Sequence, residues 1–369
     1  MMKYKNSSPG IVVDRVITAQ ANSNIALVKY WGKRSIGEDC SDESLNLPAN
    51  SSLSITFGDE LSTITSIVFS EKLNEDEFYL NDKKIDLGEK EIQERFIVLS
   101  KLRGIAGTKL RARVVSRNFV PTASGFGSSA SGMAALTFAA AKALGLGIET
   151  SRLSEIARIG SGSACRSLFG GFVEWKRGNE SDGRDSVAKQ LYQKTYWPEL
   201  RLIVTALKDP KKSISSRTGM RQTAKTSRLY QERIIGAEEN IKVLKTALKE
   251  KDFEKVGEVT MQDTMMMHAV MLDTRPPIMY LNDVSRETIN TIEELNRKEG
   301  KIIAAYTYDA GPNAVILTLD KDFDKVMEAL KKISGISKLI VPGIGGGARV
   351  LDESQSLIDP NTLLPVSGE

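Results

Sequence analysis

The chain centres on the stretch Pro121-Thr-Ala-Ser-Gly-Phe-Gly-Ser-Ser-Ala-Ser-Gly132. A strand-like run precedes it at residues 110–115, and the pattern of residues 133–144 predicts a helix after it. Glycine lets the backbone approach a ligand closely, and free N–H groups at the start of a helix attract anions. This order of strand, small-residue loop and helix favours a phosphate-binding loop.

The donors of this phosphate loop are expected to come from Ser124, Gly125, Gly127, Ser128 and Ser129. Ser131 adds a further hydroxyl. The loop lacks the Lys-Ser/Thr ending of a P-loop and does not fit the dinucleotide fingerprint GxGxxG. The other interpretation is therefore a tight turn that ends in a serine N-cap.

The composition indicates a globular protein of more than one domain, because 369 residues exceed one comfortable hydrophobic core. The net charge of +4 is small and the basic residues are interspersed with acidic ones, so we expect no nucleic-acid partner. No apolar run is long enough for a bilayer, and the first ten residues lack a signal-peptide core. We therefore expect a cytoplasmic protein without a membrane partner.

Cysteine and histidine are too scarce for several kinds of site. Cys40 and Cys165 lie far apart without the spacing of a zinc site or a disulfide framework. A Ser-His-Asp triad or a multi-histidine metal site would have to use the single histidine, His268. We expect His268 and Cys165 to be structural and assign no residue to a metal.

The pattern of elements predicts an α+β fold in two domains. Asp209-Pro210 breaks the pattern, so we place the domains at residues 1–208 and 209–369. In the first domain, strands are expected at residues 52–57, 61–69 and 77–80. In the second, helices are expected at residues 223–249, 253–267 and 285–298. Its strand-turn-strand-helix-strand order over residues 302–341 suggests a ferredoxin-like layer.

Cations and one carboxylate stand beside small-residue turns far apart in the chain: Lys29, Lys33, Arg166, Arg217 and Asp309. If they converge, the site binds a polyanion and holds one carboxylate among cations. Arginine matches a carboxylate or phosphate through paired hydrogen bonds. An aspartate near a lysine stays ionised and can orient or deprotonate a hydroxyl. The residues alone thus indicate an enzyme that acts on a phosphorylated small acid.

Several motifs together carry a family resemblance. They are Asn24-Ile-Ala-Leu-Val-Lys-Tyr-Trp-Gly-Lys-Arg34, Leu45-Asn-Leu-Pro48, Ser161-Gly-Ser-Ala-Cys-Arg-Ser-Leu-Phe-Gly-Gly171, Ser215-Ser-Arg-Thr-Gly-Met220, Met267-His-Ala269 with Pro276-Pro277, and Tyr308-Asp-Ala-Gly-Pro-Asn313. In this order they resemble the diphosphomevalonate decarboxylase family, within a superfamily of small-molecule kinases. The resemblance implies a ribosomal-S5-like N-terminal domain joined to a ferredoxin-like C-terminal domain, usually as a homodimer.

Members of this family decarboxylate a 5-phosphorylated mevalonate. Phosphate leaves the tertiary C3, the neighbouring C–C bond breaks, and CO2 and an alkene form. By resemblance, Asp309 acts at the 3-oxygen with Lys29 beside it, and Arg166 grips the substrate carboxylate. Around the 5-phosphate the resemblance places Tyr30, Lys33, Ser163, Ser216 and Arg217. It assigns the phosphate loop to ATP.

That loop departs from the family's usual Phe-Pro-Thr-Ala-Ala-Gly-Leu-Ala-Ser-Ser-Ala-Ala-Gly. Val120 intervenes between Phe119 and Pro121, and Phe126-Gly127 replaces Leu-Ala. We therefore favour the family's archaeal ATP-independent branch, which converts mevalonate 3,5-bisphosphate to isopentenyl phosphate without a cofactor. The alternative is the ATP- and Mg-dependent enzyme, which yields isopentenyl diphosphate, because Gly127 restores the loop of the wider superfamily.

Two further hypotheses stay open. One is a kinase that phosphorylates mevalonate without decarboxylating it, although Lys29, Arg166 and Asp309 count against it. The other is a non-catalytic sensor of a phosphorylated metabolite. Asp309→Asn would leave a sensor's binding unchanged, whereas a decarboxylase would lose turnover.

Overall fold

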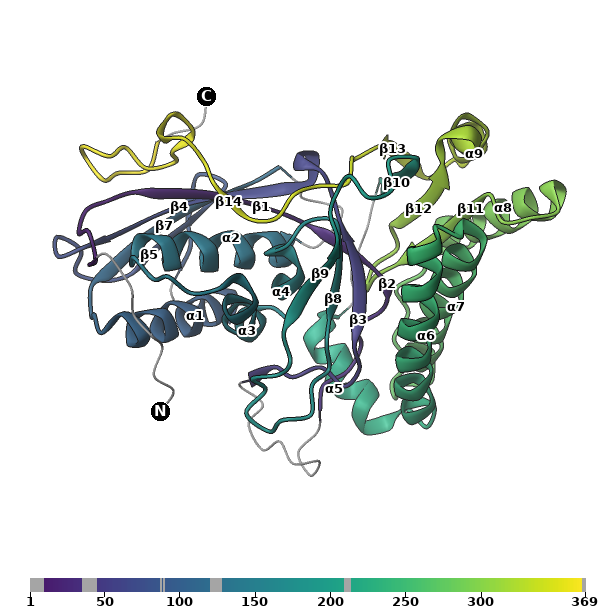
Figure 1. Cartoon of the computed structure of the whole chain (residues 1–369), viewed down its shortest axis with the longest axis horizontal. Coiled ribbons are helices and arrows are strands. Elements are labelled where there is room, and N and C mark those ends of the chain that lie inside the picture. Colours follow the sequence, from purple (N-terminus) through teal and green to yellow (C-terminus); the bar gives the residue numbers. More distant parts are fainter. Residues whose placement is uncertain are drawn as a thin grey trace.

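Three antiparallel-rich sheets and their helices form the protein (Figure 1). The computed structural model describes residues 10–34, 45–86, 88, 90–119, 128–208 and 214–366. Helices and strands are mixed along the chain, so the predicted α+β class is confirmed. No helix in these ranges is both long and apolar enough to cross a membrane.

The first sheet has the strand order β14-β1-β4-β7-β5-β6. Its strands are β1 (Ile17–Asn22), β4 (Ser62–Ser70), β5 (Glu77–Leu80), β6 (Lys83–Lys84), β7 (Arg111–Asn118) and β14 (Arg349–Val350). Asn81 and Asp82, both with positive φ, make the turn between β5 and β6, as the sequence predicts.

One face of the first sheet is covered by α2 (Ser128–Ala143), and α1 (Lys90–Ala106) and α3 (Thr150–Gly160) lie over α2 (Figure 1). The alanines of α2 are small enough for close approach to β1 and β4. Ala134, Ala135 and Ala139 are fully buried there. The packing of α2 thus fixes where its N-terminus points.

The second sheet occupies the middle of the molecule (Figure 1). It has the order β2-β3-β8-β9, from β2 (Asn24–Val28), β3 (Ser52–Thr56), β8 (Phe172–Trp175) and β9 (Ala188–Tyr192). The short helix α4 (Ala164–Ser167) precedes β8. The pairing of β2 with β3 shifts between Ala26 and Val28, so the chain leaves the ladder as it approaches Lys29.

The third sheet has the order β11-β12-β10-β13, from β10 (Leu200–Leu207), β11 (Ala304–Tyr308), β12 (Ala314–Leu319) and β13 (Ile336–Ile340). Helices α8 (Asp283–Glu299) and α9 (Phe323–Lys331) pack on its strands. Within the described residues, the chain order from β10 to β13 is one strand, four α-helices, two strands, one α-helix and one strand, and the sheet order agrees with the predicted ferredoxin-like layer.

Helices α6 (Tyr230–Glu250) and α7 (Phe253–Leu272) lie between the second and third sheets (Figure 1). One buried apolar cluster includes Leu53 of β3, Leu244 of α6 and Ile316 of β12. The two sheets therefore share a core with this helix pair.

The sequence predicts a single helix over residues 223–249, and this prediction is wrong. The structure has α5 (Ser216–Thr226), then a break, then α6. The carboxylate of Asp273 accepts hydrogen bonds from the hydroxyl of Ser227 at 2.7 Å and from the N–H of Arg228 at 2.6 Å. This contact from the end of α7 holds the break open and is not visible in the local pattern.

The sheets divide the chain at a different point from the expected 208/209. The Asp209-Pro210 break follows β10, yet β10 pairs with β12 and β13 of the third sheet. The last described segment returns to the first sheet, where β14 pairs with β1 (yellow in Figure 1). We propose a division between β9 and β10, with residues 349–366 belonging to the N-terminal unit.

The returning C-terminal segment should contribute strongly to stability. Ile358 is fully buried against Val68 and Val115. Ile358→Ala is expected to lower the free energy of unfolding by roughly 2 to 5 kcal/mol, because a buried cavity forms. Leu364→Ala is the control, since Leu364 is 54% exposed. Equal denaturation midpoints for the two variants would contradict the role of this segment.

Candidate active site

A cavity of about 600 Å³ opens where the second sheet, α5 and the end of β11 meet. The predicted residues that line it are Tyr30, Lys33, Ser129, Ser163, Arg166, Ser216, Arg217 and Asp309. Lys29 lies in the wall and reaches Asp309. Ser124, Gly125 and Gly127 fall outside the described residues, and of Ser128 only the backbone is described, as the first residue of α2.

Lys29 and Asp309 form an ion pair at the end of β2 and β11. The Nζ of Lys29 donates to Oδ1 of Asp309 at 2.7 Å. The lysine side chain is 1% exposed and the aspartate side chain 53% exposed. Burial lowers the pKa of Lys29, and the Asp309 carboxylate opposes that shift. The pair thus presents a carboxylate to the cavity with a buried ammonium behind it.

Arg166 is a buried cation whose hydrogen bonds go to neutral groups. Its Nη1 donates to Oγ of Ser52 at 2.6 Å and its Nε to Oδ1 of Asn24 at 3.2 Å. The guanidinium carbon lies 5.9 Å from the centre of the Trp175 ring. Burial lowers the pKa of Arg166, although arginine stays charged in proteins. Among the described residues this buried charge has no carboxylate partner, which favours binding of an anion from the cavity.

Tyr30 contributes a buried hydroxyl to the same wall. Its ring packs edge-on against Trp175 with centroids 4.7 Å apart. Its hydroxyl has no hydrogen-bond partner among the described residues, and burial raises its pKa. A Cβ at Gly162 would lie 2.7 Å from the Tyr30 ring, so the glycine is required for this approach. The hydroxyl is therefore held neutral, with donor and acceptor capacity for a ligand.

Arg217 joins the two halves of the chain across the cavity. Its Nη1 lies 2.7 Å from a carboxylate oxygen of Glu94 on α1, and its Nη2 donates to the carbonyl of Gly160 at 3.1 Å. Ser216 precedes it as the first residue of α5, which Ser215 caps. The small-residue turn expected beside Arg217 is helical from Ser216 on, because the Ser215 side chain accepts the N–H of Thr218 and caps the helix.

Glu94 is a cavity residue that the sequence analysis does not identify. It lies inside an ordinary amphipathic helix, where a glutamate is usually solvated. Only its contact with Arg217, far along the chain, distinguishes it. No local sequence signal could have found it.

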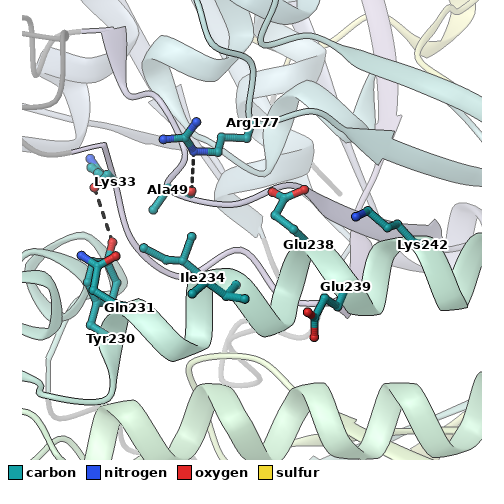
Figure 2. Close-up of a pocket in the computed structure, with 10 residues that line it drawn as sticks. Lys33, Ala49, Arg177, Tyr230, Gln231, Ile234, Glu238, Glu239 and Lys242 are labelled. Atoms are coloured by element: carbon teal, nitrogen blue, oxygen red, sulfur yellow. Dashed lines mark hydrogen bonds between the residues drawn. The ribbon is translucent and has the colours of Figure 1, made fainter.

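Lys33 lines this cavity and also a second hollow of about 390 Å³ between α6 and the segment of Lys33 and Ala49. Figure 2 shows the carbonyl of Lys33 facing the hydroxyl of Tyr230, at 3.4 Å, and Arg177 donating to the carbonyl of Ala49, at 2.8 Å. These contacts place the Lys33 segment against the first turn of α6.

The start of α2 brings Ser129 to the cavity. Ser131, in contrast, is fully buried and hydrogen-bonds the hydroxyl of Thr63 at 2.8 Å and that of Ser23 at 3.1 Å. The expected hydroxyl donor Ser131 is therefore structural. It ties α2 to the first sheet instead of facing a ligand.

His268 on α7 lies beneath the Lys29–Asp309 pair. It is 3% exposed, its Nε2 has no partner within the described ranges, and it hydrogen-bonds the backbone of Tyr308. Burial, followed by the nearby Lys29 charge, lowers the pKa of His268 to about 4. The imidazole is therefore neutral near pH 7, in agreement with the expected structural role.

The neutral His268 predicts a pH-dependent stability. Between pH 6.5, the ordinary pKa, and about 4, the unfolded chain binds a proton that the folded chain does not, so stability falls as the pH falls. The difference corresponds to on the order of 3 kcal/mol. His268→Leu should unfold with a weaker pH dependence between these values. Parallel curves of unfolding free energy against pH for the two proteins would rule this out.

Two family models together match most of this chain. Residues 21–188 match the family described as diphosphomevalonate decarboxylase-like N-terminal domain, and residues 202–343 match the mevalonate 5-diphosphate decarboxylase C-terminal domain. The diphosphomevalonate decarboxylase of Candida albicans is 42% identical over 90% of this chain and 96% of its own length.

Solved structures agree. The mevalonate diphosphate decarboxylase of Staphylococcus aureus has a TM-score of 0.83 and 35% identity, covering 92% of this chain and 98% of its own. That of Enterococcus faecalis, described for its mevalonate diphosphate mediated ATP binding, has a TM-score of 0.80 and 35% identity, covering 92% and 100%. A similar structure, of MDDEF, is a complex with MVAPP, AMPPCP and magnesium.

These relatives confirm the recognised family and the two-part α+β fold. None of the relatives' names supports the ATP-independent branch that we favoured from the altered loop. The names support the alternative, the ATP-dependent enzyme. On 42% identity to an enzyme that it covers almost completely, this chain belongs to the diphosphomevalonate decarboxylase family and is a decarboxylase of the mevalonate pathway.

Proposed function

We propose that the chain catalyses the ATP- and Mg-dependent decarboxylation of mevalonate 5-diphosphate to isopentenyl diphosphate. The names of its relatives support this substrate, and the neighbour with AMPPCP and magnesium supports the use of a nucleotide. The proposal replaces the preference for an ATP-independent enzyme, which rested on a few substitutions in the phosphate loop.

The observation that carries the proposal is the pairing of two charged groups on one cavity. Arg166 offers a buried guanidinium that has only neutral partners, and Asp309 offers a carboxylate backed by Lys29. A 3-hydroxy acid satisfies both, because its carboxylate can bind Arg166 while its hydroxyl donates to Asp309. The hydroxyl of Tyr30 and the cations Lys33 and Arg217 favour a phosphorylated group at the far end.

In this mechanism Asp309 accepts a hydrogen bond from the 3-hydroxyl and takes its proton as that oxygen is phosphorylated. The ammonium of Lys29 orients the Asp309 carboxylate through its hydrogen bond. Arg166 binds the substrate carboxylate through paired hydrogen bonds. The half-exposed Asp309 then releases this proton to solvent. When the 3-phosphate leaves, positive charge develops at C3 beside the regenerated carboxylate, and the electron pair of the bond to CO2 forms the alkene.

The described residues fit a nucleotide phosphate. The N-terminus of the 16-residue helix α2 opens at the cavity with Ser129 beside it, and helix N-termini bind phosphate. Asp309 is a half-exposed carboxylate that lines the same cavity. One or two carboxylates with substrate phosphates are a usual magnesium site. Bound ATP supplies the phosphoryl group for the 3-hydroxyl. Among the described residues no three His, Cys, Asp or Glu side chains cluster as a resident metal site.

Release of CO2 from two substrates tests the proposal. Mevalonate 5-diphosphate with ATP and Mg should give CO2, isopentenyl diphosphate and ADP, whereas mevalonate 3,5-bisphosphate without nucleotide should give none. Turnover of the bisphosphate alone would restore the ATP-independent hypothesis. ADP without CO2 would indicate a kinase, and binding without either product would indicate a sensor.

Asp309→Asn should lower kcat by about 100- to 10,000-fold, the range of a lost general base, with little change in substrate affinity. Asp283→Asn is the control, because the Asp283 side chain is 90% exposed and its ion pair with Arg286 lies within one helix. Calorimetric binding of mevalonate 5-diphosphate would separate loss of chemistry from loss of binding. Unchanged kcat in Asp309→Asn would remove the aspartate from the mechanism.

The homodimeric state and the cytoplasmic location are also proposals, and they rest on the family resemblance. Sedimentation of the purified protein tests the first, and fractionation of the source cells tests the second.

A further inference from the structure

We propose that Arg233 and Asp263, a buried ion pair of α6 and α7, are positioning residues that hold the backbone of Lys29 so that its ammonium stays on Asp309. This inference rests on the proposed function, because it assigns the pair a part in the same reaction. It concerns two residues whose sequence context carries no catalytic motif.

The backbone of Lys29 needs partners outside its sheet. The pairing of β2 with β3 is irregular from Ala26 to Val28, and Lys29 follows. A buried N–H or carbonyl without a hydrogen bond is costly. Here the N–H of Lys29 donates to Oδ1 of Asp263 at 2.7 Å. The carbonyl of Lys29 accepts from Nη2 of Arg233 at 3.1 Å and from Nδ2 of Asn50 at 2.9 Å.

The same two side chains bind each other. Nη2 of Arg233 lies 2.9 Å from Oδ1 of Asp263, and the side chains are 1% and 0% exposed. Nδ2 of Asn240 donates to the other oxygen of Asp263 at 3.0 Å. One guanidinium nitrogen and one carboxylate oxygen thus form a clamp around the Lys29 peptide, and both come from the helix pair that faces β2.

Stability alone is a poor explanation for this pair. Nε and Nη1 of Arg233 have no hydrogen-bond partner among the described residues. Burying a charge is costly, and apolar residues of similar volume often stabilise a fold as well as or better than a buried ion pair. A pair that leaves two guanidinium nitrogens unsatisfied is therefore better explained by the peptide that it holds.

Helix α7 also fixes the other member of the catalytic pair. Thr264, next to Asp263, shares a hydrogen bond of 3.0 Å with the hydroxyl of Thr307, two residues before Asp309. The hydroxyl of Thr307 also donates to the carbonyl of Ala26 at 3.2 Å. Adjacent residues of one helix thus hold the strand ends that carry Lys29 and Asp309.

Three variants test the inference on the full-length enzyme. The double variant Arg233→Met with Asp263→Leu replaces the pair by apolar side chains, and Asp263→Asn removes only the charge. Both should lower kcat for mevalonate 5-diphosphate by 10- to 100-fold while KM changes less than threefold. In the double variant this loss should occur at an unfolding midpoint near or above that of the wild type. Arg233→Lys should lower kcat less than the double variant does, because an ammonium can still bridge Asp263 and the carbonyl of Lys29.

The chain contains a matched control pair. Asp76 is buried, binds Arg103 through two hydrogen bonds of 2.9 and 2.5 Å, and accepts the backbone N–H of Ala112 at 2.8 Å. It resembles Asp263 in burial and partners, but it directly precedes β5 of the first sheet and does not line the cavity. Asp76→Asn should destabilise the fold and leave kcat of the folded enzyme within twofold of the wild type. Equal effects of Asp76→Asn and Asp263→Asn on kcat would overturn the inference.

A structural measurement keeps this inference separate from the proposed function. In crystals of Asp263→Asn, the distance from Nζ of Lys29 to Oδ1 of Asp309 should exceed 4 Å, the ion-pair limit, whereas Asp76→Asn should keep the wild-type distance. If wild-type enzyme releases no CO2, the proposed substrate fails while this comparison still applies. If Asp263→Asn keeps the short contact or the wild-type kcat, the positioning role is overturned. This test applies even if the double variant fails to fold.

Discussion

The ion pair between Lys29 and Asp309 forms only because distant parts of the fold meet. Lys29 and Asp309 are 280 residues apart in the chain, yet their charged atoms lie 2.7 Å apart. A buried ammonium loses most of its hydration. This cost is offset only while the carboxylate of Asp309 stays beside it. Strand β2 of the second sheet precedes Lys29, and strand β11 of the third sheet precedes Asp309. The ends of these two strands therefore lie close together. The helix pair α6 and α7 lies between the two sheets and contributes to a core that belongs to both.

The cations around the cavity differ in whether a carboxylate of the protein binds them. Lys29 and Arg217 each have a carboxylate partner within the protein, whereas Arg166 has a serine hydroxyl and an asparagine amide. The first two cations are already neutralised when the substrate arrives. Arg166 has no carboxylate partner among the described residues, so its guanidinium can bind an anionic group that enters the cavity.

Local pattern and resemblance together predicted much of this molecule. The strand Glu77–Leu80 has the bounds that the sequence pattern indicates. The motif residues that converge on the cavity were identified because their motifs resemble those of one family and occur in the same order. What failed depends on distant contacts: Asp273 interrupts a continuous helical pattern, and Ser131 turns away from the ligand to bind Thr63. Glu94 had no signal of its own, and the phosphate-loop substitutions pointed to the less supported cofactor choice.

The return of β14 to the first sheet has a consequence for how the chain folds during synthesis. The strand β1 emerges early, but its outer neighbour β14 lies near the other end of the chain. Until that part is made, β1 is the edge of an open sheet with unpaired N–H and carbonyl groups. Domains generally fold in order as they leave the ribosome, and an unpaired edge invites wrong pairing. The first sheet is therefore completed only after the whole third sheet has been synthesised.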